Sequence, residues 1–208
     1  MSVLKDIKKV TEKATGWGTP SEDDLPRLVA TRKPRTFRFK DDGVIPNHPR
    51  WPFLLYKGAL RFANSYDPAA VCEVLFESNG WSDSWRNGIY DYVHYHSRIH
   101  EVLGIAGGNA KVQFGGPRGR TLTLKAGDVA ILPAGTGHRC LAASKDFLGV
   151  GAYPPSGMYD ECRTSKEEHT RALPTIPKVG RPRKDPVYGK DGPLLQVWRT
   201  PNKGVKRA

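Results

Sequence analysis

Three histidines and a glutamate crowd into one short stretch, from His94 to Glu101, although the chain contains only six histidines in all. Imidazole nitrogens and carboxylate oxygens bind divalent transition metals, so this stretch is a candidate metal site. In a β-strand, residues two apart point to the same face, which would bring His94 and His96 together. The turn "SRIH" follows, and Glu101 begins the next strand, from which its carboxylate can return to the two imidazoles.

A further ligand must come from elsewhere in the chain. The segment "GDVAILPAGTGH" (127–138) predicts a strand, a Pro-Gly turn and then His138 at the head of a new strand. Strand phase turns His100 away from the cluster, so that it is either an outward residue or a hydrogen-bond partner of a ligand. His48 and His169 lie in a loop and an arm, where we expect them to be solvated. The competing interpretation of the cluster is a polar group of side chains in a β core without metal.

The spacing of these residues resembles the two motifs of the cupin family. The first motif, G-x5-H-x-H-x4-E-x6-G, is matched without a gap by Gly88, His94, His96, Glu101 and Gly108. The second, G-x5-P-x-G-x2-H-x3-N, is matched by Gly127, Pro133, Gly135 and His138, with Ala142 in place of the asparagine. Within the cupins, "NGWSDSWRNGIYDYVHYHSRIHEVLG" and "DPVYGKDGPLLQVW" resemble the YjlB-like single-domain proteins.

This resemblance implies an all-β fold, the double-stranded β-helix or jelly-roll barrel, with one divalent metal ion inside one end. The implied ligands are His94, His96, Glu101 and His138, and Fe(II), Mn(II), Ni(II), Zn(II) and Cu(II) all accept such a set. The implied function is a mononuclear metalloenzyme acting on a small molecule. Dioxygenase-type oxidoreductase chemistry is slightly favoured over an isomerase or lyase. The alternative is a metal-dependent protein that binds or senses a small ligand without turnover.

Three further side chains are predicted to share the inward face with the metal ligands. Alternation along the strands places Tyr90, Tyr92 and Cys140 there, as the candidate substrate pocket. Tyr92 is the one inward candidate for a proton-transfer residue, although the pattern supports this role only weakly. A small buried hydrophobe is the more ordinary role for Cys140.

The elements expected around the site are mostly short strands. Alternating runs separated by Gly, Asn and Pro between residues 81 and 155 are typical of a β-barrel, and strands are also expected at 36–40 and 53–60. Asp67 followed by Pro68 predicts the start of a helix that continues through "AAVCEVLFES". We divide the chain into an amphipathic helix (2–15) and basic arm within 1–35, one cupin barrel at 36–162, and a basic, proline-rich arm at 163–208 that wraps the barrel.

The composition is that of a globular protein with a single core. The 208 residues are 38 % hydrophobic, and no apolar run approaches the roughly 20 residues of a membrane helix. Mean hydropathy is -0.54. We expect no secretory signal, and the three cysteines form no paired motif, so a cytoplasmic location without disulfides is predicted.

The net charge of +12 is carried by the two arms. Residues 1–40 have a net charge of +5, residues 41–162 of -1, and residues 163–208 of +8. A domain that reads nucleic acid would be expected to carry its charge on the folded face, so we predict no specific nucleic-acid partner. A homodimer is expected, because cupins commonly pair their barrel sheets and the apolar face of the 2–15 helix has no evident partner in the barrel.

Overall fold

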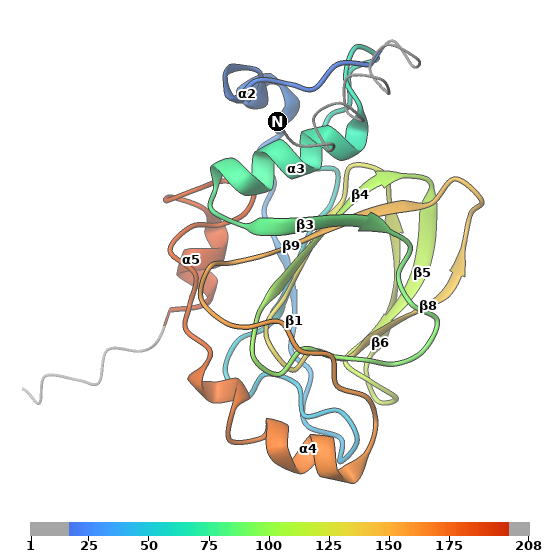
Figure 1. The fold of residues 1–208 in the computed structure, drawn as a ribbon, viewed down its shortest axis with the longest axis vertical. Coiled ribbons are helices and arrows are strands. Elements are labelled where there is room, and N and C mark those ends of the chain that lie inside the picture. The colour runs from blue at the N-terminus through green and yellow to red at the C-terminus, as the bar shows by residue number, and fades with distance from the viewer. Residues whose placement is uncertain (1–16, 200–208) are drawn as a thin grey trace, which may run out of the picture.

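The computed structural model describes residues 17–199, so the helix predicted at 2–15 lies outside the described residues. Two antiparallel sheets face each other and form a jelly-roll barrel, the double-stranded β-helix that the motifs imply (Figure 1). The larger sheet has the order β1 (Arg35–Phe37), β2 (Phe53–Tyr56), β7 (Val129–Leu132), β4 (Glu101–Gly107), β9 (Leu148–Tyr153) and β3 (Ser82–Asn87). The smaller has the order β6 (Arg120–Lys125), β5 (Asn109–Phe114) and β8 (His138–Ala143).

The space between the two sheets is filled by apolar side chains. Alternate residues of the strands point inward, as the period of two requires, and Leu103 and Ile105 of β4 are both buried there. The rings of Phe53 on β2 and Phe114 on β5 meet with their centroids 4.5 Å apart, joining the larger sheet to the smaller one. Glu101 is in phase with Leu103 and therefore starts β4 on the inner side of the barrel.

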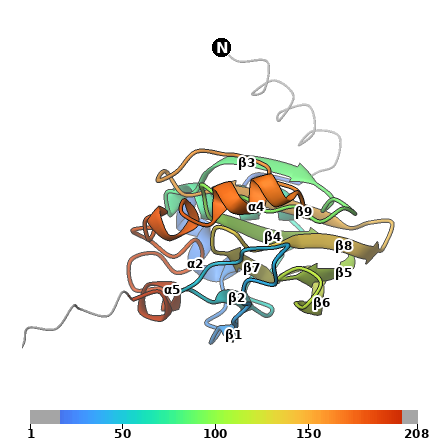
Figure 2. The ribbon, with the colours of Figure 1, turned by 90° about the horizontal axis from the view of Figure 1, so that it is seen from below.

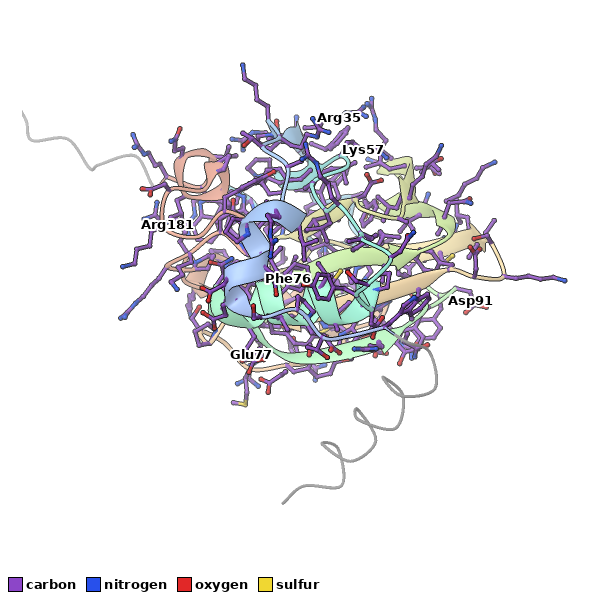
Figure 3. The ribbon with its side chains drawn as sticks, turned by 90° about the horizontal axis from the view of Figure 1, so that it is seen from above. Arg35, Lys57, Phe76, Glu77, Asp91 and Arg181 are labelled. Atoms are coloured by element: carbon purple, nitrogen blue, oxygen red, sulfur yellow. The ribbon has the colours of Figure 1, made fainter. Side chains whose placement is uncertain are left out.

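The outer face of the larger sheet is also buried, because helix α3 (Pro68–Ser78) packs on β4, β9 and β3. The prediction of this helix is confirmed: Asp67 caps it by accepting a hydrogen bond from the Ala69 N–H at 3.0 Å. At Gly104 the helix comes so close that an added Cβ would lie 2.9 Å from Phe76. Phe76 is fully buried, and Figure 3 shows Glu77 near the edge of the molecule.

The described part of the C-terminal segment runs along the barrel through α4 (Lys166–Ala172), η2 (Ile176–Lys178) and α5 (Pro193–Val197) (Figures 1 and 2). Trp198 is fully buried at its end. Its ring stacks on Trp51 at 5.2 Å between centroids, and its Nε1–H donates to the Pro52 carbonyl at 2.8 Å. The described part of this segment is therefore integrated into the outer core.

One buried carboxylate fastens this segment to the sheet. Asp185 accepts hydrogen bonds from the backbone N–H groups of Val187, Tyr188 and Leu194, and from the hydroxyl of Tyr56 on β2. A charged group can be this deeply buried only when several donors replace its lost water. Asp185 thus links the path of the C-terminal segment to the barrel wall.

The N-terminal part of the described chain is short in regular structure. It contains η1 (Glu22–Asp24) and α2 (Leu25–Leu28), whose two leucines are buried. β1 overlaps the strand predicted at 36–40 and begins one residue earlier, β2 lies within the strand predicted at 53–60, and both are shorter than predicted. None of the helices in residues 17–199 is long and apolar enough to cross a membrane.

The prediction of a continuous strand through "GIYDYVHYH" is wrong. The segment forms only single bridges, in which His94 pairs with His138 and the next residue, Tyr95, pairs with Cys162. Residues 90–96 follow residues 135–140 through widely spaced hydrogen bonds, from Cys140 N to Tyr90 O, between His94 and His138, and from Gly135 N to His96 O. Tyr95 bonds instead to Cys162, so no regular ladder forms. The local alternation of side chains expected for a strand therefore does not extend through this segment.

Candidate metal centre

Three buried histidines converge at one end of the barrel. His94, His96 and His138 each offer a ring nitrogen, and these nitrogens all lie within 4.8 Å of one another. Two backbone hydrogen bonds hold the segments together, from His94 N to His138 O at 3.2 Å and from His138 N to His94 O at 2.9 Å. The position of the cluster therefore depends on these two hydrogen bonds, which join the loop before β4 to His138, the first residue of β8.

Backbone carbonyl groups orient all three imidazole rings. The Nδ1 atoms of His94, His96 and His138 lie next to the carbonyl oxygens of Tyr92, Asp160 and Thr136, respectively. A carbonyl can only accept, so Nδ1 carries the proton in the neutral ring and Nε2 is left with a free lone pair. Such partners fix the tautomer and the direction of a metal-binding histidine. The three-histidine cluster suits a single metal ion.

Glu101 lies beside the histidine cluster. Its Oε2 atom is 3.5 Å from Nε2 of His96 and 3.4 Å from Nε2 of His138. Its Oε1 atom accepts a hydrogen bond from the Tyr153 hydroxyl at 3.2 Å, whereas Oε2 is buried and has no hydrogen-bond partner. A buried carboxylate oxygen without a donor is costly. A cation among the imidazoles would supply the missing interaction, so the donor set fits a divalent metal.

Burial and mutual charge set the protonation of the cluster. Burial lowers the pKa of His138 to about 3 and also lowers the pKa of His94. Burial alone would raise the pKa of Glu101, but His96, His138 and His94 outweigh it and bring this pKa down to about 2. Burial also opposes protonation of His96, yet the neighbouring Glu101 raises its pKa overall. At neutral pH the site therefore presents an ionised carboxylate beside mostly neutral imidazoles.

A cavity of about 590 Å³ opens onto the cluster. This is within the usual range for small-molecule sites. Besides the three histidines and Glu101, its lining includes charged and polar residues of β3 and aromatic and apolar residues of β9 and the segment after it. The main members of this second group are Tyr153, Pro154, Pro155, Met158 and Tyr159, and Trp85 of β3 adds a further ring.

Sequence reasoning missed the contribution of β3 and β9 to the cavity. The Nε1–H of Trp85 donates to the Tyr153 hydroxyl at 2.8 Å, and that hydroxyl donates to Glu101. At Gly151 an added Cβ would lie 2.2 Å from the Trp85 ring, so only glycine leaves room for this ring. The two glycines that precede Tyr153 on the same face of β9, Gly149 and Gly151, were the available signal that a large ring packs there.

The three predicted pocket residues separate in the structure. Tyr90 lines the cavity, whereas Tyr92 and Cys140 are not among its described lining residues. The Tyr92 hydroxyl lies 3.4 Å from Oε1 of Glu161, and the Arg163 guanidinium covers its ring at 3.5 Å. Cys140 packs against the core between the sheets. The reason for this separation is that residues around Tyr92 are not in a regular strand.

The remaining histidines differ in their surroundings. His100 faces away from the cluster, as strand phase predicts, but Trp51 and Trp198 cover it, and its Nδ1 accepts from Ala134 N at 2.9 Å. His48 is buried against Trp51, so the expectation that it is solvated is wrong. The Nε2 atom of His169 lies 2.8 Å from Oδ1 of Asp41.

Comparison with known proteins identifies the chain's relatives. It is 40 % identical over 167 residues to the uncharacterised protein YjlB of Bacillus subtilis strain 168, covering 80 % of this chain and 98 % of that protein. The chain belongs to the YjlB family. No family model matches the YjlB-family chain. The resemblance to YjlB-like proteins expected from the sequence is thus confirmed by an alignment that covers nearly the whole length of that relative.

Solved structures match this YjlB-family chain only at low sequence identity and low TM-score. An oxalate decarboxylase of Lactobacillus farciminis, in a formate complex, matches with a TM-score of 0.33 and 17 % identity over 64 % of this chain. A Klebsiella pneumoniae protein with a double-stranded β-helix domain matches with a TM-score of 0.33 and 14 % identity, covering 68 % of this chain and 94 % of that one. The chain spans about a third of the length of the oxalate decarboxylase (33 %). The fold assignment rests on the two sheets and the placement of the motif residues.

Proposed function

We propose that this protein is a mononuclear metalloenzyme that acts on a small molecule. The observation that carries the proposal is the buried Oε2 of Glu101, which has no hydrogen-bond partner and lies within 3.5 Å of Nε2 atoms of two histidines at the inner end of a cavity. His94, His96, His138 and Glu101 would hold the ion. A bound divalent ion supplies Lewis acidity and, when it is redox-active, access to oxidation by dioxygen.

Tyr153 and Trp85 orient Glu101 beside the cluster and do not take part in proton transfer. Tyr153 accepts from Trp85 and donates to Glu101, so its hydroxyl proton is already committed. Burial raises the pKa of Tyr153 well above its ordinary value, which keeps the hydroxyl protonated. Tyr153 therefore positions the carboxylate. Oxidative chemistry at the metal needs the fewest protein acids and bases, and we place a dioxygenase reaction ahead of an isomerase or lyase reaction.

The same arrangement favours one alternative, a protein that binds a small ligand through the metal without turnover. Among the described residues that line the cavity, the ionisable groups other than the proposed ligands are Asp83, Arg86, Tyr90, Tyr153 and Tyr159. None is a histidine, and Asp83 is the one carboxylate among them that could act as a general base. A ligand-binding protein would need no such base.

Oxygen consumption by metal-loaded protein separates the two functions. The protein is stripped with chelator and reloaded separately with Fe(II), Mn(II), Ni(II), Cu(II) and Zn(II). Oxygen uptake and product formation are then followed with small acids, diketones and thiols. The enzyme proposal predicts turnover with at least one redox-active ion and none for the equally treated His96→Ala variant. Binding of a compound without conversion by any loaded form would favour the ligand-binding alternative.

A further inference from the structure

Exposed apolar side chains gather at the mouth of the cavity. Among the described residues, the large exposed hydrophobic side chains are Trp17, Tyr90, Leu141, Met158, Tyr159 and Leu173. Three of them, Tyr90, Met158 and Tyr159, line the cavity, with exposed fractions of 46 %, 57 % and 53 %. Single exposed hydrophobic residues are ordinary, but a group of them around a cavity is typical of a binding site.

Two of these rings lie directly beside proposed metal ligands. The Tyr90 ring meets His94 edge-on at 5.3 Å between centroids, and the Tyr159 ring lies 5.0 Å from His96. Tyr159 also meets Tyr153 edge-on at 5.5 Å. The next part of the wall is apolar and contains Ile99 and Leu103. A molecule that reaches the histidine cluster must therefore place the rest of its body against aromatic and aliphatic surface.

The described lining of the cavity contains no unpaired cation that could bind a second negative charge of a ligand. Arg86 is the one Lys or Arg among its described lining residues. Its Nε and Nη2 donate to the two oxygens of Glu73, each at 2.7 Å, and its Nη1 donates to Asp67 at 2.6 Å. The charge of Arg86 is thus already matched by two carboxylates, and Asp83 adds a further acidic group to the lining.

Resting on the proposed function, we infer that the substrate has one oxygen-donor head group and an aromatic or bulky apolar body, and carries at most one negative charge. The head group reaches the centre formed by His94, His96 and His138, and the body packs on Tyr90, Met158 and Tyr159. Phosphorylated compounds and dicarboxylates do not fit this cavity, because the second anionic group would find no free cation.

Hydroxamates test this inference, since they share one metal-binding head and differ in body. Binding of acetohydroxamate, benzohydroxamate and succinic acid monohydroxamate to the Zn(II)-loaded protein is measured by calorimetry. We expect benzohydroxamate to bind at least about tenfold more tightly than acetohydroxamate, and the compound with the extra carboxylate to bind no better than acetohydroxamate. Tyr159→Ala should weaken benzohydroxamate by about threefold to tenfold and weaken acetohydroxamate by a clearly smaller factor. Leu141→Ala, at an exposed apolar residue outside the cavity lining, is the matched control and should change neither.

The outcomes separate this inference from the proposed function. If neither zinc nor any of Fe(II), Mn(II), Ni(II) and Cu(II) loads, the metal site itself is refuted. If zinc loads but no hydroxamate binds, the inferred substrate site is wrong while the metal site stands. If acetohydroxamate binds but benzohydroxamate gains nothing, or if the carboxylate-bearing compound binds most tightly, the substrate class is wrong while the metal site stands. Equal effects of Tyr159→Ala and Leu141→Ala would also overturn the inference, because the body would then not contact the mouth.

Discussion

The hydroxyl of Tyr153 donates to Oε1 of Glu101 at 3.2 Å and leaves Oε2 of the same carboxylate as a buried oxygen with no hydrogen-bond partner. Tyr153 thus fixes the position of Oε1, and Oε2 faces the histidines. Groups that orient a metal ligand in this way commonly alter metal affinity by about tenfold to a hundredfold.

Tyr153→Phe should therefore weaken metal binding by about tenfold, because the ring stays in place while Glu101 loses its partner. Titration with Co(II) or Zn(II), followed by calorimetry, measures the effect. Tyr159→Phe is the matched control, since the Tyr159 hydroxyl lies near Glu161 and not near Glu101. Equal affinity of wild type and Tyr153→Phe would show that this hydrogen bond does not position the carboxylate.

Asp160 connects the wall of the cavity to a proposed ligand. Its carboxylate accepts from Ser97 N and Ser97 Oγ and from Arg98 N, while its carbonyl oxygen faces Nδ1 of His96. Asp160→Ala should lower both metal affinity and the free energy of unfolding, the latter by about 1–3 kcal/mol, because three donors lose their acceptor. Metal titration and urea unfolding test this. Glu161→Ala, at a carboxylate bonded to Arg163, should have a much smaller effect on both.

The C-terminal segment should be required for stability through Asp185. Asp185→Ala leaves three backbone N–H groups and the Tyr56 hydroxyl without their acceptor, so we expect a loss of about 2–4 kcal/mol in the free energy of unfolding. Chemical denaturation of the full chain measures it, with the exposed Asp191→Ala as control. Equal stability of the two variants would mean that the segment is held by its apolar contacts alone.

His48 should make the fold sensitive to acid. Burial lowers the pKa of His48 to about 3 in the folded protein, whereas an unfolded histidine titrates near 6.5. The unfolded state therefore binds a proton first, and stability is lost as pH falls from about 6.5 toward 3. Between pH 7 and 5 this amounts to on the order of 1–2 kcal/mol for this residue. Comparing urea unfolding of wild type and His48→Asn in chelator should show a flatter pH dependence in the variant. Parallel curves would contradict a role for His48.

The histidine cluster beside Glu101 could be predicted from the sequence because it depends on the spacing of residues along the chain. The motif positions of His94, His96, Glu101 and His138 required no knowledge of the distant segments. The start of helix α3 could be predicted in the same way, because the adjacent residues Asp67 and Pro68 mark it. These features depend on near neighbours in sequence, which is where patterns of residue type are most informative.

The partners that come from far along the chain could not be predicted. Tyr153 reaches Glu101 only because β9 pairs with β4, and Trp85 reaches Tyr153 only because β3 pairs with β9. His48 and the outer face of His100 were expected to be open, but the C-terminal segment and Trp198 bury that side of the sheet. The burial of these two histidines depends on the C-terminal segment, whose basic, proline-rich composition is typical of a solvated arm.

The metal content of reconstituted protein tests the central claim most directly. Wild type, His96→Ala, Glu101→Gln and His100→Gln are loaded with Zn(II), freed of excess ion and measured by elemental analysis, with circular dichroism as the check on folding. We expect about one ion per chain in wild type and in His100→Gln. We expect a sharp loss of metal in His96→Ala and weakened retention in Glu101→Gln, because an amide oxygen is a poorer ligand than a carboxylate. Loss of metal from folded His100→Gln together with full retention by Glu101→Gln would contradict the central claim, as would a folded wild-type protein that none of Fe(II), Mn(II), Ni(II), Cu(II) or Zn(II) can load.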